Sequence, residues 1–242
     1  MNEEKFTSKA DLYDKYRPSY PMALIDFLWD KTHAETVADI GAGTGIFTKC
    51  LCTKPWKVIA VEPNSDMSGK LRANLSDVEI VNASAENTGI RSGSIGMVTA
   101  AQAFHWFNRE QFARECKRIL TPEGGVALVW NTRTVTDMQT ERNQIFLRHT
   151  GVYDSVKGNH NGSDRFSPER YFSELTQIRF FNRMEMDCEQ YIGCEMSRSY
   201  APKKGTPVYE AMENDLVLLF QKYEQGGKVS IEYETECFLG KF

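Results

Sequence analysis

Short, almost wholly apolar stretches recur along the first 130 residues of the chain. Each is bounded by glycine, proline or other turn-forming residues and is too short for a helix of ordinary length. Strands that are apolar along their whole length are typical of a parallel sheet covered on both faces. The pattern therefore predicts strands at 36–40, 57–61, 78–82, 94–101 and 126–130.

Apolar residues between these strands recur at helical spacing. The clearest predicted helix spans 108–120, where Phe112 and Cys116 lie on one apolar face. Asn108 is suited to cap its first turn, with Gln111 placed to complete a capping box. Further helices are predicted at 21–33, 46–52 and 66–75. This alternation of strands and helices predicts an α/β fold with a doubly wound, mostly parallel sheet.

The regular alternation ends after Trp130. The pattern beyond it predicts helices at 137–150, 167–175 and 208–225, strands at 178–188 and 228–239, and a polar loop at 151–164. No repeat or linker divides the chain, so we expect one domain. Its parts are an N-terminal lid and helix (1–36), a core that binds a cofactor (37–136), and the last strands with a helical substrate cap (137–242).

A glycine-rich loop follows the first predicted strand, in Val37-Ala-Asp-Ile-Gly-Ala-Gly-Thr-Gly45. Glycines at this place allow a tight turn and let a ligand approach the backbone closely. The next strand ends at Glu62, 21 residues after Gly41. A carboxylate at that distance is placed to accept hydrogen bonds from the ribose hydroxyls of an adenosine ligand.

The spacing of the glycines distinguishes between adenosine ligands. Dinucleotide-binding loops read G-x-G-x-x-G and hold a pyrophosphate at a helix N-terminus, whereas this loop reads G-x-G-x-G and is followed by Ile46. No lysine and serine follow as in a nucleoside triphosphate loop. The loop therefore favours an adenosine ligand without a phosphate bridge. A nicotinamide-dependent oxidoreductase on a similar sheet is the alternative.

Several segments resemble class I S-adenosylmethionine-dependent methyltransferases. Asp39-Ile-Gly-Ala-Gly-Thr-Gly45 and Val58-Ile-Ala-Val-Glu-Pro63 resemble the first two motifs of that family, and Leu120-Thr-Pro-Glu-Gly-Gly125 resembles the turn before its fifth strand. Tyr13-Asp-Lys-Tyr-Arg-Pro-Ser-Tyr-Pro21 and Ala101-Gln-Ala-Phe-His-Trp-Phe107 resemble the subgroup that includes trans-aconitate methyltransferase-like proteins. The resemblance implies a Rossmann-like, seven-stranded sheet with an antiparallel last strand and a helical cap.

The resemblance also implies which residues bind S-adenosyl-L-methionine. The three glycines would line its methionine and ribose, with Asp39 holding the loop and Glu62 binding the ribose diol. Met67 would lie near the adenine, Ala85 and Glu86 at its edge, and Gln102 beside the sulfonium. The full set is Asp39, Gly41, Gly43, Gly45, Glu62, Met67, Ala85, Glu86 and Gln102.

A methyl acceptor would need an apolar pocket and, for some acceptors, a base. His105 is the candidate catalytic base because it follows the fourth strand and a histidine side chain can exchange a proton near neutral pH. Contact with the substrate and a purely structural role are the alternatives for this residue. Ordinary core packing or a solvated surface position remains the alternative for the aromatic and arginine candidates. The residues we expect to contact substrate are Tyr13, Tyr16, Arg17, Trp106, Trp130 and Arg133.

Composition narrows the choice of partner. The 242 residues carry a net charge of −4 with no basic stripe, which argues against a nucleic acid. The six cysteines include no C-x-x-C pair, so no metal site is expected. No apolar run is long enough for a membrane span, and the first residues lack a signal-peptide pattern. We expect a cytoplasmic monomer or homodimer that methylates a small molecule, with a non-catalytic cofactor-binding protein as a further alternative.

Overall fold

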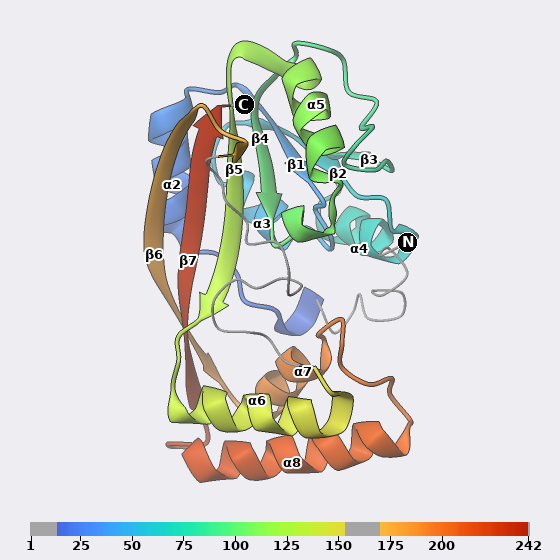
Figure 1. Cartoon of the computed structure of the whole chain (residues 1–242), viewed down its shortest axis with the longest axis vertical. Coiled ribbons are helices and arrows are strands. Elements are labelled where there is room, and N and C mark those ends of the chain that lie inside the picture. Colours follow the sequence, from blue (N-terminus) through green and yellow to red (C-terminus); the bar gives the residue numbers. More distant parts are fainter. Residues whose placement is uncertain (1–13, 153–169, 242) are drawn as a thin grey trace.

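A seven-stranded sheet forms the centre of the protein in the computed structural model, which describes residues 14–152 and 170–241. The strand order is β3-β2-β1-β4-β5-β7-β6. Neighbouring strands from β3 to β5 pair in parallel, whereas β7 is antiparallel to both β5 and β6. The predicted fold class is confirmed, including the reversed last strand, which lies between β5 and the edge strand β6 (Figure 1).

The bounds of the elements follow the predicted alternation closely. The core elements are α2 (Met22–Thr32), β1 (Thr36–Ile40), α3 (Ile46–Leu51), β2 (Lys57–Val61), α4 (Ser65–Asn74), β3 (Glu79–Val81), β4 (Ile95–Ala101), the 3-10 turn η2 (Phe104–Trp106), α5 (Arg109–Ile119) and β5 (Leu120–Arg133). The later elements are α6 (Asp137–Thr150), β6 (Glu174–Met186), α7 (Cys188–Met196), α8 (Pro207–Tyr223) and β7 (Val229–Lys241).

Helices cover both faces of the sheet. Leu28 of α2 and Phe47 of α3 pack with Val37 and Val58 on one face. On the other face, Phe112 of α5 belongs to the cluster that contains Ile40 and Leu128. Because β1, β2, β4 and β5 each contribute side chains to both clusters, these strands are apolar along most of their length, as the sequence pattern predicts.

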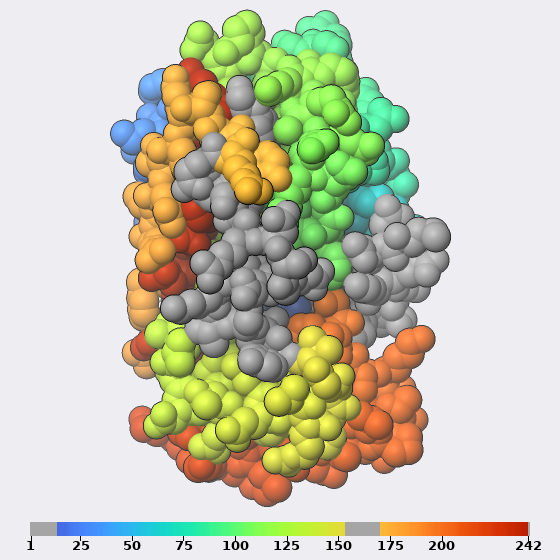
Figure 2. Space-filling view, in the orientation of Figure 1, coloured from blue at the N-terminus to red at the C-terminus, as the bar shows by residue number. Residues whose placement is uncertain are grey.

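The helical cap has a hydrophobic core of its own. Helices α6, α7 and α8 gather at one end of the sheet, where the long strands β5, β6 and β7 reach them (Figure 1). Phe146, Tyr191 and Leu216 come from the three helices and pack with Tyr233 of β7. Helices α6 and α8 form the lower end of the molecule in the space-filling view (Figure 2). The cap is thus a second layer built on extensions of the sheet.

The structure corrects the predictions in the C-terminal third. We predicted a helix over 167–175, but Glu174 and Leu175 begin β6 and pair with β7; 167–169 lie outside the described residues. Most of the polar loop predicted at 151–164 also lies outside them. The sequence pattern did not reveal α7, whose residues 191–196 are all buried and therefore show no amphipathic face. Among the described residues, no helix is long and apolar enough to cross a membrane.

Candidate active site

A pocket of about 250 Å³ opens beyond the carboxyl ends of β1, β2 and β4. Its position is the point where the strand order reverses between β1 and β4, which is where open α/β sheets bind ligands. Most of the predicted site residues line it together. These are Asp39, Gly41, Gly43, Glu62, Met67, Ala85, Glu86, Gln102, Arg17 and Trp106.

Glu62 lies at the end of β2 with its carboxylate fixed by two backbone groups. The N–H of Gly43 donates to Oε2 over 2.8 Å, and the N–H of Asn64 donates to Oε1 over 2.9 Å. The residue is 7% exposed. Each carboxylate oxygen can accept more than one hydrogen bond, so a carboxylate held in this way can still receive the two hydroxyls of a ribose.

The first two glycines of the loop occupy the left-handed region, with φ of 72° at Gly41 and 59° at Gly43. A Cβ on Gly41 would lie 2.6 Å from Cβ of Ala103, so this glycine permits close packing. A Cβ on Gly43 would meet no protein atom within 4 Å. Because Gly43 lines the pocket, that open space belongs to the volume a ligand would fill.

Asp39 is buried beneath the loop and is 1% exposed. Its carboxylate accepts hydrogen bonds from the hydroxyls of Thr48, over 2.6 Å, and Thr99, over 2.8 Å. Burial raises the pKa of Asp39 to about 6, although the two hydroxyl donors act to lower it. Asp39 therefore joins β1 to α3 and β4 while presenting a carboxylate that titrates in a mildly acidic range.

The start of α4 and the turn after β3 also line the pocket. Met67 is buried, and its N–H donates to the side chain of Asn64, which caps α4. Ala85 is also buried. The carboxylate of Glu86 accepts a hydrogen bond from the N–H of Asn108 over 2.8 Å, at the start of α5. Together with Glu62, these residues line one cavity with both apolar and polar groups.

Gln102 has a backbone conformation that is uncommon for a residue with a side chain. Its φ is 55°, and its N–H donates to Val129 O over 2.8 Å. Its Nε2 donates to Asn131 O over 2.8 Å. Both bonds go to β5, so the sheet enforces the strained conformation at the edge of the pocket.

Five predicted site residues lie outside the pocket lining. Gly45 packs against α4, and a Cβ at this position would lie 3.1 Å from Leu71 of that helix. His105 is half-buried in η2, with its ring 4.7 Å from the ring of Trp106. Trp130 is buried among Phe104 and Phe238. The other two, Tyr16 and Arg133, contact residues of the cap. A sixth predicted residue, Tyr13, lies outside the described residues.

Several pocket residues were not predicted. Asn131 lines the pocket two residues before Arg133, and its Nδ2 donates to Ser19 O over 3.2 Å. Ser19 lies between two further lining residues, Pro18 and Tyr20. Asn64 also lines it, and its place directly after Glu62-Pro63, before a helical pattern, was a recognisable capping position. The N-terminal segment at 17–20 is thus part of the pocket and is held by β5.

No group of three potential metal-ligating side chains is found within 14–152 and 170–241. The six cysteines all lie in these ranges and are free thiols. The described lining of the pocket offers carboxylates, amides, an arginine, backbone groups and aromatic rings.

Comparison with known proteins agrees with a pocket that binds a cofactor. The family described as "Methyltransferase domain" matches residues 38–128, from β1 to β5. An uncharacterized methyltransferase of Mycobacterium tuberculosis is 39% identical over 128 residues, covering 53% of this chain and 52% of that protein. An uncharacterized methyltransferase-like protein of Schizosaccharomyces pombe is 35% identical over 136 residues, covering 54% and 53%. The chain therefore spans about half the length of the curated relatives it matches.

A solved structure agrees over a longer stretch. A protein of Anaeromyxobacter dehalogenans, provisionally described as a type II methyltransferase, superposes with a TM-score of 0.70 at 21% identity. The match covers 93% of this chain and 98% of that one, and it bears on the fold alone. Over residues 38–128 the chain is thus similar to a methyltransferase domain, and the solved structure agrees with it in fold.

Proposed function

We propose that this protein transfers a methyl group from S-adenosylmethionine to a small-molecule acceptor. The observation that carries the proposal is the buried carboxylate of Glu62, held by the N–H groups of Gly43 and Asn64 at the edge of a pocket of about 250 Å³. This is the geometry expected for clasping the ribose of an adenosine ligand. The proposal covers the whole chain, whereas the family match covers residues 38–128.

The lining residues fit the different parts of S-adenosylmethionine. Met67 and Ala85 offer an apolar surface for the adenine, and Glu86 offers a polar one. The open space beside Gly43 suits the methionine chain, because no protein atom lies where its Cβ would be. Asp39 and Gln102 also line the pocket and would lie near the cationic centre. The cofactor would supply an activated methyl group, and the protein would position it.

The acceptor is proposed to be a small molecule that carries a carboxylate or a hydroxyl group. Arg17 lines the pocket and is suited to a carboxylate, and Trp106 and Phe107 provide an aromatic wall. A carboxylate acceptor needs no base, whereas a hydroxyl acceptor must lose a proton. His105 is the candidate for that role because it adjoins Trp106. The likeness to the trans-aconitate methyltransferase-like subgroup agrees with an acidic acceptor.

A cytoplasmic location and a monomeric or homodimeric state are part of the same proposal. The free thiols agree with a reducing compartment, and a pocket of about 250 Å³ agrees with a small acceptor in place of a nucleic acid.

Isothermal titration with S-adenosylhomocysteine tests the cofactor assignment. Loss of the Glu62 carboxylate in Glu62→Ala should weaken binding about 10- to 100-fold, because two charge-assisted hydrogen bonds are lost. Glu79→Ala is the matched control, since Glu79 is an exposed carboxylate on neighbouring β3 and does not line the pocket. Binding of NAD in place of S-adenosylhomocysteine, or equal affinities in the wild type and Glu62→Ala, would overturn the proposal.

Turnover separates an enzyme from a non-catalytic cofactor-binding protein. Incubation with methyl-labelled S-adenosylmethionine and a pool of small carboxylic acids and alcohols should transfer label to one of them. The labelled product identifies the acceptor atom by its stability to base, because methyl esters hydrolyse and methyl ethers do not. Tight binding of the cofactor without transfer to any acceptor pool would favour the non-catalytic alternative.

A further inference from the structure

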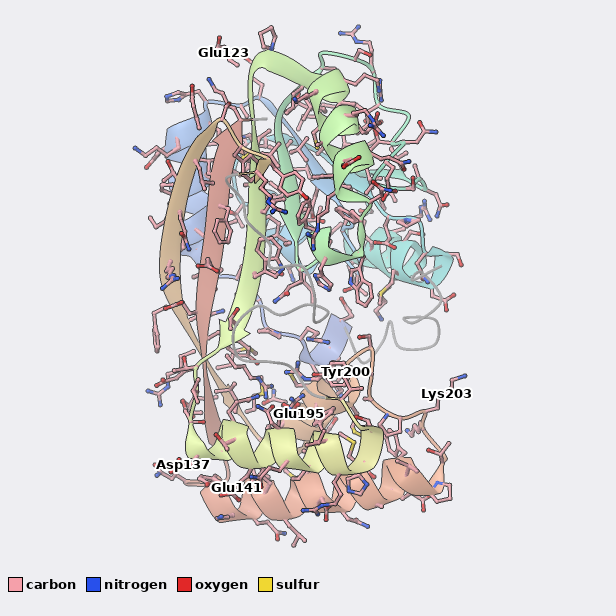
Figure 3. The ribbon with its side chains drawn as sticks, viewed as in Figure 1. Glu123, Asp137, Glu141, Glu195, Tyr200 and Lys203 are labelled. Carbon is pink, nitrogen blue, oxygen red and sulfur yellow. The ribbon has the colours of Figure 1, made fainter. Side chains whose placement is uncertain are left out.

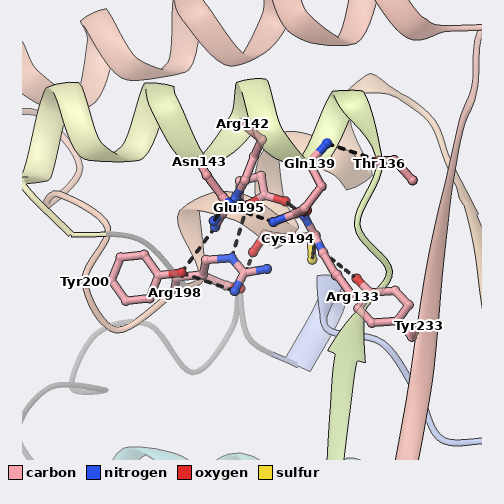
Figure 4. A network of polar contacts seen from close by, with 11 residues as sticks. Arg133, Thr136, Gln139, Arg142, Asn143, Cys194, Glu195, Arg198, Tyr200 and Tyr233 are labelled. Atoms are coloured by element: carbon pink, nitrogen blue, oxygen red, sulfur yellow. Dashed lines mark hydrogen bonds and ion pairs between the residues drawn. The ribbon is translucent and has the colours of Figure 1, made fainter. Parts of the chain in front are cut away.

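Strand β5 joins the pocket to the cap. It extends from the end of the molecule where the exposed Glu123 lies toward the helical layer that contains Glu195 (Figure 3). At its last residue, the guanidinium group of Arg133 pairs with Glu195 of α7 in a buried cluster of ion pairs (Figure 4). Two residues earlier, Asn131 lines the pocket. Asn131 therefore stands on a stretch of strand whose end is fixed to the cap.

Two amide side chains hold one backbone carbonyl of the N-terminal segment. The carbonyl oxygen of Ser19 accepts a hydrogen bond from Nδ2 of Asn131 on β5 over 3.2 Å, and another from Nδ2 of Asn182 on β6 over 2.8 Å. A carbonyl oxygen has two lone pairs, so both of its acceptor positions are filled. Both asparagines are half-buried. We call this arrangement the Ser19 clamp.

Thr235 of β7 fixes the orientation of the first of these amides. Asn131 and Thr235 lie opposite each other in the pairing of β5 with β7, and the buried hydroxyl of Thr235 donates to Oδ1 of Asn131. The carbonyl oxygen of Ser19 can only accept a hydrogen bond, so it must meet the NH₂ group of Asn131. The amide oxygen is then left for the hydroxyl of Thr235, and the side chain of Asn131 has one satisfied orientation.

The Ser19 clamp holds a segment that forms part of the pocket wall. Arg17, Pro18 and Tyr20, on either side of Ser19, all line the pocket. The ring of Tyr20 packs edge-on against the ring of Phe47 in α3, with 4.8 Å between the ring centroids. Residues 17–20 therefore pass from β5 to the first turn of α3, and the clamp fixes their main chain to the sheet.

The strand order places this wall on the side of the pocket away from Glu62. Glu62 follows β2, whereas Asn131 belongs to β5, three steps along the order β2-β1-β4-β5. Neighbouring strands lie about 4.8 Å apart, so about 14 Å of sheet separates the two residues. Nε2 of Gln102, which lines the same side, donates to the backbone oxygen of Asn131 over 2.8 Å. With a ribose at Glu62, the methionine chain and the methyl group of the cofactor would extend toward this side.

We propose that Asn131, Asn182 and Thr235 are positioning residues for the methyl-bearing end of the cofactor. By holding the carbonyl oxygen of Ser19, they keep residues 17–20 in place as the wall beside the methionine chain. The inference rests on the proposed function, because it takes Glu62 as the residue that receives the ribose. Asn182 and Thr235 are not among the residues that line the pocket, so a change at either acts on a ligand through the Ser19 clamp.

Isothermal titration of the full-length protein with S-adenosylhomocysteine and with adenosine tests the inference. Asn182→Ala removes one bond of the clamp, and Thr235→Val removes the hydroxyl that orients Asn131 while keeping the shape of the side chain. Each should weaken binding of S-adenosylhomocysteine about 3-fold, and the two together about 10-fold, the scale of one and two net hydrogen bonds. Adenosine lacks the methionine chain, so its dissociation constant should stay within about twofold of the wild-type value in all variants.

Gln177→Ala is the matched control. Gln177 lies on the same strand as Asn182 but on the opposite face of the sheet, where its amide donates to Glu236. This variant should keep the wild-type affinity for both probes even if its Tm falls. If the wild type binds S-adenosylhomocysteine and the double variant binds it equally well, the inference is wrong. An equal loss of affinity for adenosine would also refute it, because that is the result of a general loosening of the fold. Failure of the wild type to bind S-adenosylhomocysteine would instead refute the proposed function, and this inference with it.

Discussion

The backbone N–H of Gly43 donates to Oε2 of Glu62 over 2.8 Å, which joins the glycine loop to the end of β2. The loop therefore serves two purposes. It gives a ligand close access to the backbone, and it orients the carboxylate that would receive the ribose. A change at either residue should act on cofactor binding more than on folding.

Gly43→Ala should separate binding from stability. Its methyl group would enter the pocket without touching protein, and an alanine at φ 59° costs about 1–2 kcal/mol. We expect a small loss of Tm and at least about a 10-fold loss of affinity for S-adenosylhomocysteine, equivalent to about 1.4 kcal/mol. Gly41→Ala is the comparison, because its methyl group would overlap Ala103 and should lower the Tm more. Unchanged affinity in Gly43→Ala would contradict the ligand's placement.

The part of the fold that would bind the cofactor could be predicted from the sequence, because short-range patterns specify its strands and turns. The strands at Thr36–Ile40 and Lys57–Val61 have the predicted bounds, since each is a short apolar run between turn residues. The G-x-G-x-G loop and Glu62 follow these strands, so their meeting at one sheet edge was predictable as well.

The cap could not be predicted in the same way. Residues 191–196 of α7 are all buried and so show no amphipathic period, and only the capping box of Asp187 and Gln190 marked the start of the helix. Arg142 and Glu195 are 53 residues apart and meet through the packing of α6 on α7. No local pattern encodes that pairing. Arg133 was predicted to contact substrate, but the structure places its guanidinium in the cluster with Glu195.

The carboxyl group of Asp39 should make stability depend on pH in a particular window. Its pKa is about 6 in the folded protein, compared with an ordinary value of 3.8. The folded state therefore binds its proton more tightly than the unfolded state, and this contribution to stability is lost as pH rises from about 4 to about 6. The full loss is on the order of 2–3 kcal/mol.

Asp39→Asn removes this titration. The free energy of unfolding of Asp39→Asn, relative to that of the wild type, should therefore increase as pH rises from about 4 to about 7 in urea-unfolding measurements. Thr53→Val, which removes an exposed hydroxyl in the turn after α3, serves as the control and should show a constant difference. A pH-independent difference for Asp39→Asn would show that burial does not perturb this carboxyl group.

Tyr16 should act as the anchor of the N-terminal segment that lines the pocket. A Cβ on Gly193 of α7 would overlap the ring of Tyr16, and the hydroxyl of Tyr16 donates to Glu189 over 2.6 Å. Gly193→Ala should displace the tyrosine and with it residues 17–20, lowering both the Tm and the affinity for S-adenosylhomocysteine.

A double-mutant cycle tests that anchor. Tyr16→Ala alone should also lower the Tm, but adding Gly193→Ala to it should cost much less than in the wild type, because the overlap no longer exists. Additive effects would place the cost of Gly193→Ala elsewhere, for example in α7 itself.

The single carboxylate of Glu195 should be among the most stabilising side chains of the cap. Its neutralisation in Glu195→Gln would remove the carboxylate that pairs with three buried guanidinium groups, and loss of one partner of a buried ion pair costs about 3–5 kcal/mol. Glu141→Gln on α6 is the comparison, because it breaks an exposed pair with Lys222 and should change stability little.

Because the pKa of Glu195 is lowered by the arginines, the contribution of Glu195 to stability is present at neutral pH and disappears only as pH falls well below about 4. Urea unfolding at neutral pH should therefore show a large difference for Glu195→Gln that narrows in strong acid. If Glu195→Gln lowered the free energy of unfolding no more than Glu141→Gln does, the ion pairs of Glu195 would not be what stabilises the cap.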